Sequence, residues 1–427
     1  MRTKQKLFLF LLLFTSALTF TLFSCSSPTN PDLLSSLTLT VDGVTSTEAF
    51  IKLSTNNVSL PASVALSRNN KQINNFTLIT ADTTIVDENL NPNQSYTYSA
   101  ELTGTNNQRA VSGSVQIQTL DTTSHNFTWQ TFTFGGQGGS SSLYDVAIIN
   151  ENDIWAVGEM YVYDSTGSPV LYNAVHWDGS KWEFKKIQFY TICGQQSKTP
   201  YPAKAIFAFN ENEIWIAMDG DQIVKLENGI QTQIICLSWS FVINKIWGTS
   251  SNDLYAVGNG GNIAHYRNGF WGKINSGTNL NINDIWGDFN KETGKWEILA
   301  VASKIFSSFN RAILSIDPAT RKVTQLSSEP IGGTLSSVWF KSNNQYFLSG
   351  DGIYQKYRLR DNNWKNKLFD ITRYFIDKIR GNDINDVVAV GAFGEVLHYN
   401  GKSWKSYKNI TKINDGAYYS VTIKDNL

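Results

Sequence analysis

One seven-residue stretch decides the fold: Asn252-Asp253-Leu254-Tyr255-Ala256-Val257-Gly258. It returns as residues 152–158 (Asn-Asp-Ile-Trp-Ala-Val-Gly) and as residues 385–391 (Asn-Asp-Val-Val-Ala-Val-Gly). Weaker copies occupy 212–217, 296–301 and 345–350, and equivalent positions lie 40 to 60 residues apart. Repeats of this period, rich in residues that favour strands, predict the blades of a β-propeller rather than helical repeats.

Each repeat predicts four strands. An inner strand comes first, as in 245–248, and the quoted apolar stretch follows it. The stretch is apolar at consecutive positions, which is typical of a strand covered on both faces. The third strand ends in Asp178-Gly179, Asn228-Gly229, Asn268-Gly269 or Asn400-Gly401. Such dipeptides favour type I′ turns, which need positive φ at both central residues.

The number of blades depends on the two ends of the repeat region. Six units are complete. Residues 418–423 resemble a further inner strand and residues 129–132 a fourth strand, so the two ends are predicted to form a partial seventh blade or to close the ring by pairing. Closure protects sheet edges that would otherwise be exposed. We expect seven blades, with six as the alternative.

Composition excludes some functions. The 427 residues include 36 Lys+Arg and 36 Asp+Glu, so the formal net charge is zero and the basic footprint of a nucleic-acid binder is absent. The hydrophobic share of 41% supports a real core, and the aromatic share of 13% favours β-structure. We therefore expect an all-β protein that does not bind nucleic acid.

The first residues predict an export signal. Arg2, Lys4 and Lys6 precede an apolar run at 7–23, which fits a signal peptide over 1–24 and is at the lower limit for a membrane-spanning helix. Leu22-Phe23-Ser24-Cys25 resembles the bacterial lipobox, which implies that Cys25 carries a lipid anchor. Residues 25–36 then form the lipidated cysteine and a tether, and the protein is expected in the cell envelope, at the periplasmic or surface face of the outer membrane.

Residues 37–120 predict a β-sandwich, because short alternating runs are separated by turn residues. The segment 90–96 (Leu-Asn-Pro-Asn-Gln-Ser-Tyr) is similar to the corner of fibronectin type III domains, in which a tyrosine hydroxyl bonds to upstream backbone. The region lacks the Trp that these domains usually carry, so another sandwich of similar size is the alternative. Residues 127–427, the expected propeller, resemble propeller repeats of bacterial secreted proteins and lipoproteins.

Three of the four histidines occupy one repeat position: His176, His265 and His398. Each lies six residues before a tryptophan that opens the fourth strand, namely Trp182, Trp271 or Trp404. Equivalent positions on different blades lie on separate radii of a ring. We therefore expect these histidines and tryptophans to be structural, with ligand binding by the histidines as the alternative.

Other candidate chemistry is sparse. The sequence has no Gly-x-Ser-x-Gly motif, His-Glu-x-x-His motif or paired Cys-x-x-Cys motif, so we expect no cofactor and no metal. A pair of opposed carboxylates of the glycosidase kind is not excluded. Cys193 and Cys236 form either a disulfide or two free thiols, because spacing alone does not decide.

These observations favour a lipid-anchored envelope protein that binds a protein or glycan partner through propeller loops and does not catalyse a reaction. The long insertions at 160–173 and 191–202 are the candidate binding loops. One alternative is a polysaccharide lyase or hydrolase with carboxylates in the central funnel. Another is an assembly factor for an envelope complex.

Overall fold

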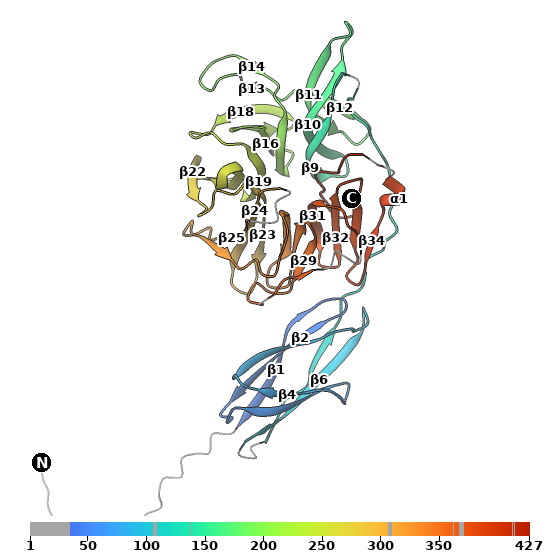
Figure 1. The fold of residues 1–427 in the computed structure, drawn as a ribbon, viewed down its shortest axis with the longest axis vertical. Helices are drawn as coiled ribbons and strands as arrows, with labels where there is room; N and C mark the ends of the chain where they lie inside the picture. Colours follow the sequence, from blue (N-terminus) through green and yellow to red (C-terminus); the bar gives the residue numbers. More distant parts are fainter. Residues whose placement is uncertain are drawn as a thin grey trace, which may run out of the picture.

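The computed structural model describes residues 35–105, 109–136, 138–305, 310–361, 363–366, 371–411, 413 and 415–427. They form a small sandwich followed by a larger ring of sheets along the long axis of the molecule (Figure 1). Cys25 and the predicted signal peptide lie outside the described residues. No helix among the described residues is long and apolar enough to cross a membrane.

The N-terminal domain consists of two sheets around one core. One sheet has the order β1-β2-β5, and the other has the order β4-β3-β6-β7 with β8 also paired to β6. The strands are β1 (Ser36–Val44), β2 (Ala49–Asn56), β3 (Ala62–Arg68), β4 (Lys71–Leu78), β5 (Asp82–Asp87), β6 (Ser95–Gly104), β7 (Arg109–Val111) and β8 (Val115–Gln118). Side chains alternate between core and solvent along β6, so that Tyr98 and Leu102 are buried between the sheets.

The predicted corner is present in this sandwich. The Asn91 N–H donates a hydrogen bond of 2.9 Å to the hydroxyl of Tyr96, which joins the loop to the start of β6. The finer assignment to the fibronectin type III class stays a prediction.

The rest of the chain is a β-propeller. Its described residues form six four-stranded antiparallel sheets in chain order, here called blades 1 to 6. Blades 1 to 3 comprise β9 (Ser142–Asn150), β10 (Asp153–Tyr163), β11 (Pro169–Trp177) and β12 (Trp182–Lys185); β15 (Ala203–Asn210), β16 (Glu213–Met218), β17 (Gln222–Glu227) and β18 (Ile230–Cys236); and β19 (Ile243–Ser250), β20 (Asp253–Gly258), β21 (Asn262–Arg267) and β22 (Phe270–Asn275).

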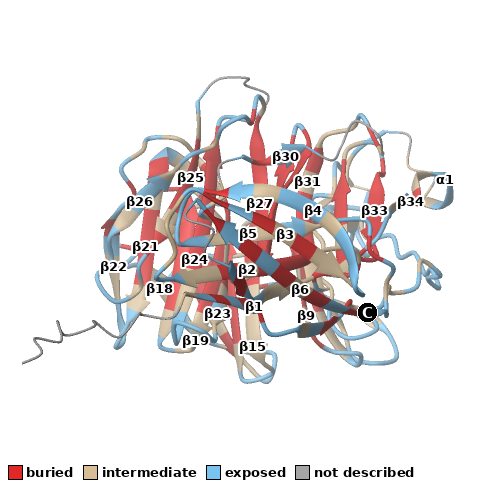
Figure 2. Ribbon diagram, turned by 90° about the horizontal axis from the view of Figure 1, so that it is seen from below, coloured by how far each residue is buried: buried red, intermediate tan, exposed pale blue. Residues whose placement is uncertain are grey.

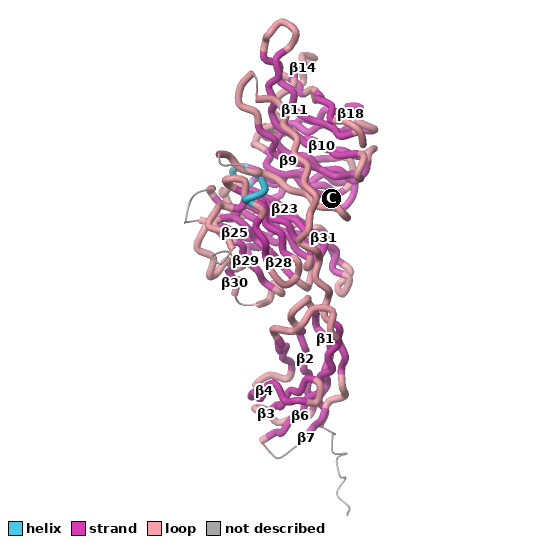
Figure 3. Tube along the Cα trace, turned by 90° about the vertical axis from the view of Figure 1, so that its right-hand side faces the viewer, coloured by secondary structure: helices cyan, strands magenta, loops and turns pink. Residues whose placement is uncertain are grey.

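Blades 4 to 6 have the same arrangement. They comprise β23 (Ile282–Asn290), β24 (Lys295–Ser303), β25 (Arg311–Ile316) and β26 (Val323–Leu326); β27 (Leu335–Lys341), β28 (Gln345–Gly350), β29 (Ile353–Lys356) and β30 (Lys365–Asn366); and β31 (Ile376–Asp383), β32 (Asp386–Gly391), β33 (Val396–Tyr399) and β34 (Trp404–Ser406). Outside the blades lie a two-stranded ribbon of β13 (Phe189–Tyr190) and β14 (Lys198–Thr199), the 3-10 turn η1 (Asn259–Gly261) and the short helix α1 (Lys408–Thr411), coloured cyan in Figure 3.

Neighbouring blades pack their sheet faces together. Trp155 and Val157 of blade 1, for example, share a buried cluster with Ile206 and Ile214 of blade 2. Figure 2 shows buried residues concentrated on the strands and exposed ones on the turns. This double coverage explains why the second strand of each repeat is apolar at consecutive positions.

The glycine that ends the quoted motif is required by close packing. A Cβ at Gly258 would lie 1.9 Å from the carbonyl oxygen of Val242, and a Cβ at Gly391 would lie 2.0 Å from that of Phe375. At Gly258 and Gly391 the backbone before the inner strand therefore approaches too closely for a larger residue, whereas blades 2 and 4 have Met218 and Ala302 at the equivalent position.

The type I′ prediction is right for two hairpins and wrong for two. Asn228 and Asn268 have φ of 50° and 53°, and the glycine after each is also positive. At 178–179 and 400–401 only the glycine is positive. In these longer connections, Asp178 accepts backbone N–H groups from the next turn residues, as Asn400 does, so the side chain forms the turn.

Both ends of the repeat region contact blade 6, through Phe127 of the linker and Tyr418 of the C-terminal segment, but among the described residues the two ends do not pair with each other. The described residues contain no seventh four-stranded sheet, and of residues 415–427 only Ala417 forms a bridge, to Ala392. The C-terminal segment lies between β31 and β9, as Figure 1 shows near the label C. Counted as complete sheets, the expected seventh blade is not formed among the described residues.

Candidate functional site

The three repeat histidines each bond to an aspartate of their own repeat. The ring Nε2 atoms of His176, His265 and His398 lie 2.9, 2.6 and 3.0 Å from Oδ1 of the paired aspartates. These are Asp153, Asp253 and Asp386, the second residues of the three clear repeat motifs. Each pair joins the start of the second strand to the end of the third strand in one blade.

The surroundings of these histidines fit a structural role. His265 is fully buried, and its ring stacks on Tyr255 at a centroid distance of 4.3 Å. Although burial raises the pKa of Asp253, hydrogen bonds from His265 and Thr249 outweigh it and hold that pKa below its usual value. Within the described residues, no group of three or more His, Cys, Asp or Glu side chains is placed to hold a metal ion.

The predicted fourth-strand tryptophans pack on aromatic residues of the third strand. Trp271 lies 5.3 Å from the ring of Tyr266, and Trp404 lies 5.1 Å from the ring of Tyr399. Trp182 lies 5.8 Å from Trp177, and the linker residue Phe134 covers it at 5.2 Å. These contacts lie at the outer edges of blades 1, 3 and 6.

Sequence reasoning missed a ring of residues around the propeller axis. Each inner strand contributes one buried side chain, and that residue pairs in register with the Val position of Ala-Val-Gly or its equivalent. In chain order the six residues are Asp145, Ala205, Lys245, Asp284, Ser337 and Lys378. The order acidic, small, basic therefore occurs twice around the ring.

Each acidic residue of this axial ring forms an ion pair with a basic residue two blades further along the chain, past the small residue of the blade between them. Lys245 Nζ lies 2.6 Å from Asp145 Oδ2. Asp284 accepts from both Lys378 and Arg380. The acids also accept the N–H groups of Ile206 and Val338, at 2.9 and 3.1 Å, so they tie the inner strands together.

Burial and charge pairing set the protonation of these groups. Burial raises the pKa of Asp284, but the attraction of Arg380 and Lys378 outweighs it and leaves that pKa below its usual value. Burial lowers the pKa of Lys245, and Asp145 partly compensates. These carboxylates are held in ion pairs and do not form the opposed acid and base of a glycosidase.

Asp377 differs from the axial ring. Burial raises its pKa to about 6, and Lys378 lowers it only in part. Such a value lies in the range of a general acid. Asp377 lies on the inner strand β31, next to Lys378 of the axial ring.

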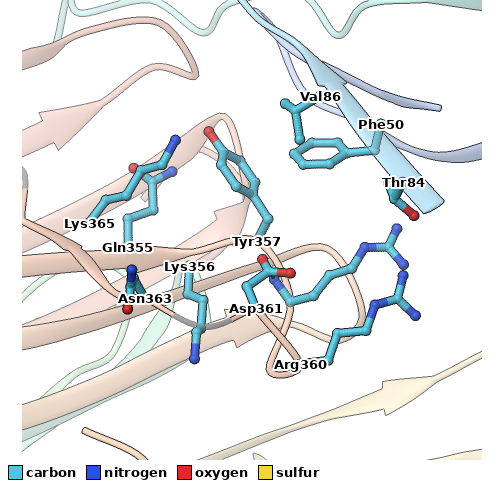
Figure 4. A pocket seen from close by; sticks show the side chains of 11 residues that line it. Phe50, Thr84, Val86, Gln355, Lys356, Tyr357, Arg360, Asp361, Asn363 and Lys365 are labelled. Carbon is cyan, nitrogen blue, oxygen red and sulfur yellow. Dashed lines mark hydrogen bonds between the residues drawn. The ribbon is translucent and has the colours of Figure 1, made fainter. Parts of the chain in front are cut away.

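A pocket of about 230 Å³ lies where the sandwich meets the propeller (Figure 4). Phe50 of β2 faces Tyr357, which follows β29, at a ring distance of 4.6 Å. Arg358 and Arg360 also line the pocket, and both bond to Asp42 of the sandwich, at 2.8 and 2.9 Å. Both arginines are therefore used in ion pairs between the propeller and the sandwich.

The two candidate binding loops lie at the end of the molecule far from the sandwich (Figure 1). In one, β10 and β11 extend past the blade as a hairpin, paired as far as Tyr163 and Pro169. In the other, the β13–β14 ribbon is linked to blade 2 by a disulfide between Cys193 and Cys236, with a Cα–Cα distance of 6.1 Å. Of the two alternatives, a disulfide or two free thiols, the structure has the disulfide.

No protein-family model matches the chain, and no curated protein matches it. Similar solved structures include YCF48 bound to D1 peptide, with 15% identity, 67% of this chain and 86% of that chain covered, and a TM-score of 0.49. A quinoprotein alcohol dehydrogenase-like protein from Bacteroides thetaiotaomicron has 10% identity over 87% of this chain and 94% of that chain, with a TM-score of 0.40. The WD40 β-propeller domain of Doa1 has 9% identity over 59% of this chain and 90% of that chain, with a TM-score of 0.37. At these identities the likeness concerns the fold alone.

Proposed function

We propose that this protein is a lipid-anchored scaffold of the bacterial cell envelope that holds a protein or glycan partner on its distal loops and catalyses no reaction. The observation that carries the proposal is the placement of the β10–β11 hairpin and the disulfide-linked β13–β14 ribbon at the end opposite the sandwich. A tether and a sandwich on the membrane side would then set the distance of these loops from the bilayer.

The contact between the domains supports this arrangement. A stalk positions a binding surface only if it is stiffly joined to it. Asp42 bonds to two arginines of the propeller, Tyr357 bonds to Glu48, and Asn385 donates to the carbonyl oxygen of Asp121. We propose that these contacts together hold the sandwich and the propeller in one relative orientation.

The distal hairpin provides the test. Joining Tyr161 to Leu171 through an Asn-Gly turn removes the tip but keeps the pairing of those two residues. We expect this variant to keep the melting temperature of the parent and to lose partner capture from solubilised envelope and binding on a glycan array. A matched control is Phe270→Ser, which alters a side chain that is 80% exposed on blade 3. Equal capture by parent and trimmed protein would refute the proposal.

The rival function is a polysaccharide lyase or hydrolase, in which Asp377, whose pKa burial raises to about 6, would be the general acid. A general acid at this position predicts a rate that falls as pH rises above about 6 and that is lost in Asp377→Asn. Release of oligosaccharides from envelope polysaccharide by the parent protein, and not by this variant, would establish the enzyme.

A further inference from the structure

The C-terminal segment occupies the place of an inner strand of a next blade. The Tyr418 N–H donates to the carbonyl oxygen of Gly391 at 3.1 Å. A similar contact joins two complete blades elsewhere, where the Ile243 N–H donates to Gly220 at 3.1 Å, two residues beyond Met218, the blade 2 equivalent of Gly391. Ser420 then donates to Asp145 of the axial ring at 2.8 Å, so the segment bridges blade 6 and blade 1.

This segment has no strand beside it. Among the described residues, no backbone hydrogen bond is formed by residues 419–423, although the side chains of Tyr418 and Val421 pack on blade 6. On the rim, the linker places Phe127 on Tyr407, 5.6 Å away, without entering a sheet. The second and third strand positions between tail and linker are therefore unoccupied by any described strand.

The repeat itself shows what is missing, because equivalent positions in the blades act as internal controls. On the face of blade 1 that points away from blade 2, Val146 is partly exposed. Its equivalents in blades 2 to 6 are each 0 or 1% exposed. These are Ile206, Ile246, Ile285, Val338 and Ile379.

The opposite side of the junction shows the same deficit. Val388 lies on the face of blade 6 that is turned toward the C-terminal segment, and it is partly exposed. Its equivalents in blades 1 to 5 are at most 2% exposed. These are Trp155, Trp215, Tyr255, Leu299 and Phe347. Two apolar faces that a blade covers everywhere else are thus incompletely covered here.

We propose that an extended peptide segment of a partner protein binds at this junction as an added β-strand beside residues 419–423 and covers Val146 and Val388. Free backbone donors and acceptors between two apolar faces select a peptide strand over a glycan or a lipid, because only a strand satisfies both. A segment with alternating apolar side chains fits best. This surface is separate from the distal loops, so it stands or fails independently of the proposed function.

The chain supplies its own probe. A synthetic peptide of residues 252–267 carries β20 and β21, the second and third strands of blade 3. Hydrogen–deuterium exchange on the full protein should show fast exchange at 419–423 and a slowing of about tenfold or more when this peptide is added, since pairing protects amides. A peptide of the same composition in scrambled order should have no effect.

Variants separate this site from nonspecific binding. Val146→Lys and Val388→Lys place a charge on the two faces, and Phe270→Lys places one on an exposed apolar residue elsewhere. We expect the first two to weaken peptide affinity at least about tenfold with a parent-like melting temperature, and the third to leave affinity unchanged. Failure of the peptide to protect 419–423, or equal binding by all variants, overturns the proposal. The proposal is also overturned if the parent protein forms a dimer that Val146→Lys dissociates. A second copy of the chain, and not a partner peptide, would then occupy the junction.

Discussion

Asp284 on the inner strand of blade 4 binds Arg380 of blade 6 through two hydrogen bonds of 2.8 Å and so ties together two blades that are not neighbours. Ser337 of the blade between them is small enough to let this pair form, and it donates a hydrogen bond to Asp284 itself. The corresponding pair in the other half of the ring joins Asp145 and Lys245. The axis of the propeller is thereby filled by paired charges.

Removing one charge of the axial ring should destabilise the whole propeller. Asp284→Asn leaves Arg380 and Lys378 buried without their counter-ion, which costs about 3–5 kcal/mol in the free energy of unfolding. Chemical denaturation measures this change. Asp288→Asn, a few residues along the same strand, is the control. A change below about 1 kcal/mol in the free energy of unfolding would show that the ring is not a structural element.

The same carboxylate predicts acid sensitivity. Because the pKa of Asp284 is lowered in the folded protein, its stabilising effect is present above the unfolded value of about 3.9 and is lost as pH falls toward the folded value. The parent protein should therefore lose stability below about pH 4, and Asp284→Asn should show a smaller loss. Parallel curves of melting temperature against pH for the two proteins would contradict this.

The repeat histidines should affect stability and not binding. His265→Gln weakens the contact with Asp253 in a buried site, with an expected cost of about 1–3 kcal/mol. Partner capture at a temperature where the variant is folded should equal that of the parent. Loss of capture by a folded variant would instead favour the ligand-binding alternative for His176, His265 and His398.

The linker should detach at mildly acidic pH. His125 Nδ1 lies 2.9 Å from His398 Nδ1, and burial, His398 and Lys405 together lower the pKa of His125. A lowered pKa means that the docked linker excludes a proton, so docking is favoured above the free value of about 6.5 and weakens as pH falls below it. Protease cleavage within 126–136 should therefore increase below that pH in the parent. His125→Gln should show cleavage that does not change with pH over this range, whereas a matching increase in that variant would exclude His125 as the cause.

The domain contact should depend on Asp42. Asp42→Asn removes the counter-ion that Arg358 and Arg360 share, so the distribution of angles between sandwich and propeller should broaden. Small-angle scattering or distance distributions between labels in the two domains measure this. Lys52→Met, which removes an exposed ion pair with Asp82 at 3.8 Å, is the control and should have no effect. An unchanged distribution in Asp42→Asn would show that other contacts hold the domains.

Features that depend on residues close together in the sequence could be predicted, whereas contacts between residues far apart in the sequence could not. The Ala-Val-Gly motif and the shared position of the histidines are local, and they led to the blades. The pair of Asp145 with Lys245 joins residues 100 positions apart, and no local pattern shows it. Aligning the six inner strands would have revealed acidic, small and basic residues in the same order twice. The predicted turn type at 178–179 and 400–401 was wrong because it was based on the dipeptide alone. These connections between strands have four residues, whereas a type I′ hairpin turn has two.

The C-terminal segment shows another limit of sequence interpretation. Residues 418–423 have the alternation of an inner strand and occupy the place of one, yet they form no ladder. Strand formation needs a partner with free backbone groups, and the described residues offer none at that place. Pattern alone therefore predicted the position of this segment but not its pairing.

Crosslinking mass spectrometry on the intact protein in its envelope tests the central proposal most directly. Lys198 lies on the β13–β14 ribbon at the distal end, whereas Lys71 lies on β4 of the sandwich, and both are exposed. We expect partner crosslinks from Lys198, lost when the disulfide-linked ribbon is shortened and unaffected by Phe270→Ser. Partner crosslinks from Lys71 with none from Lys198 would contradict the assignment of the distal loops as the binding surface.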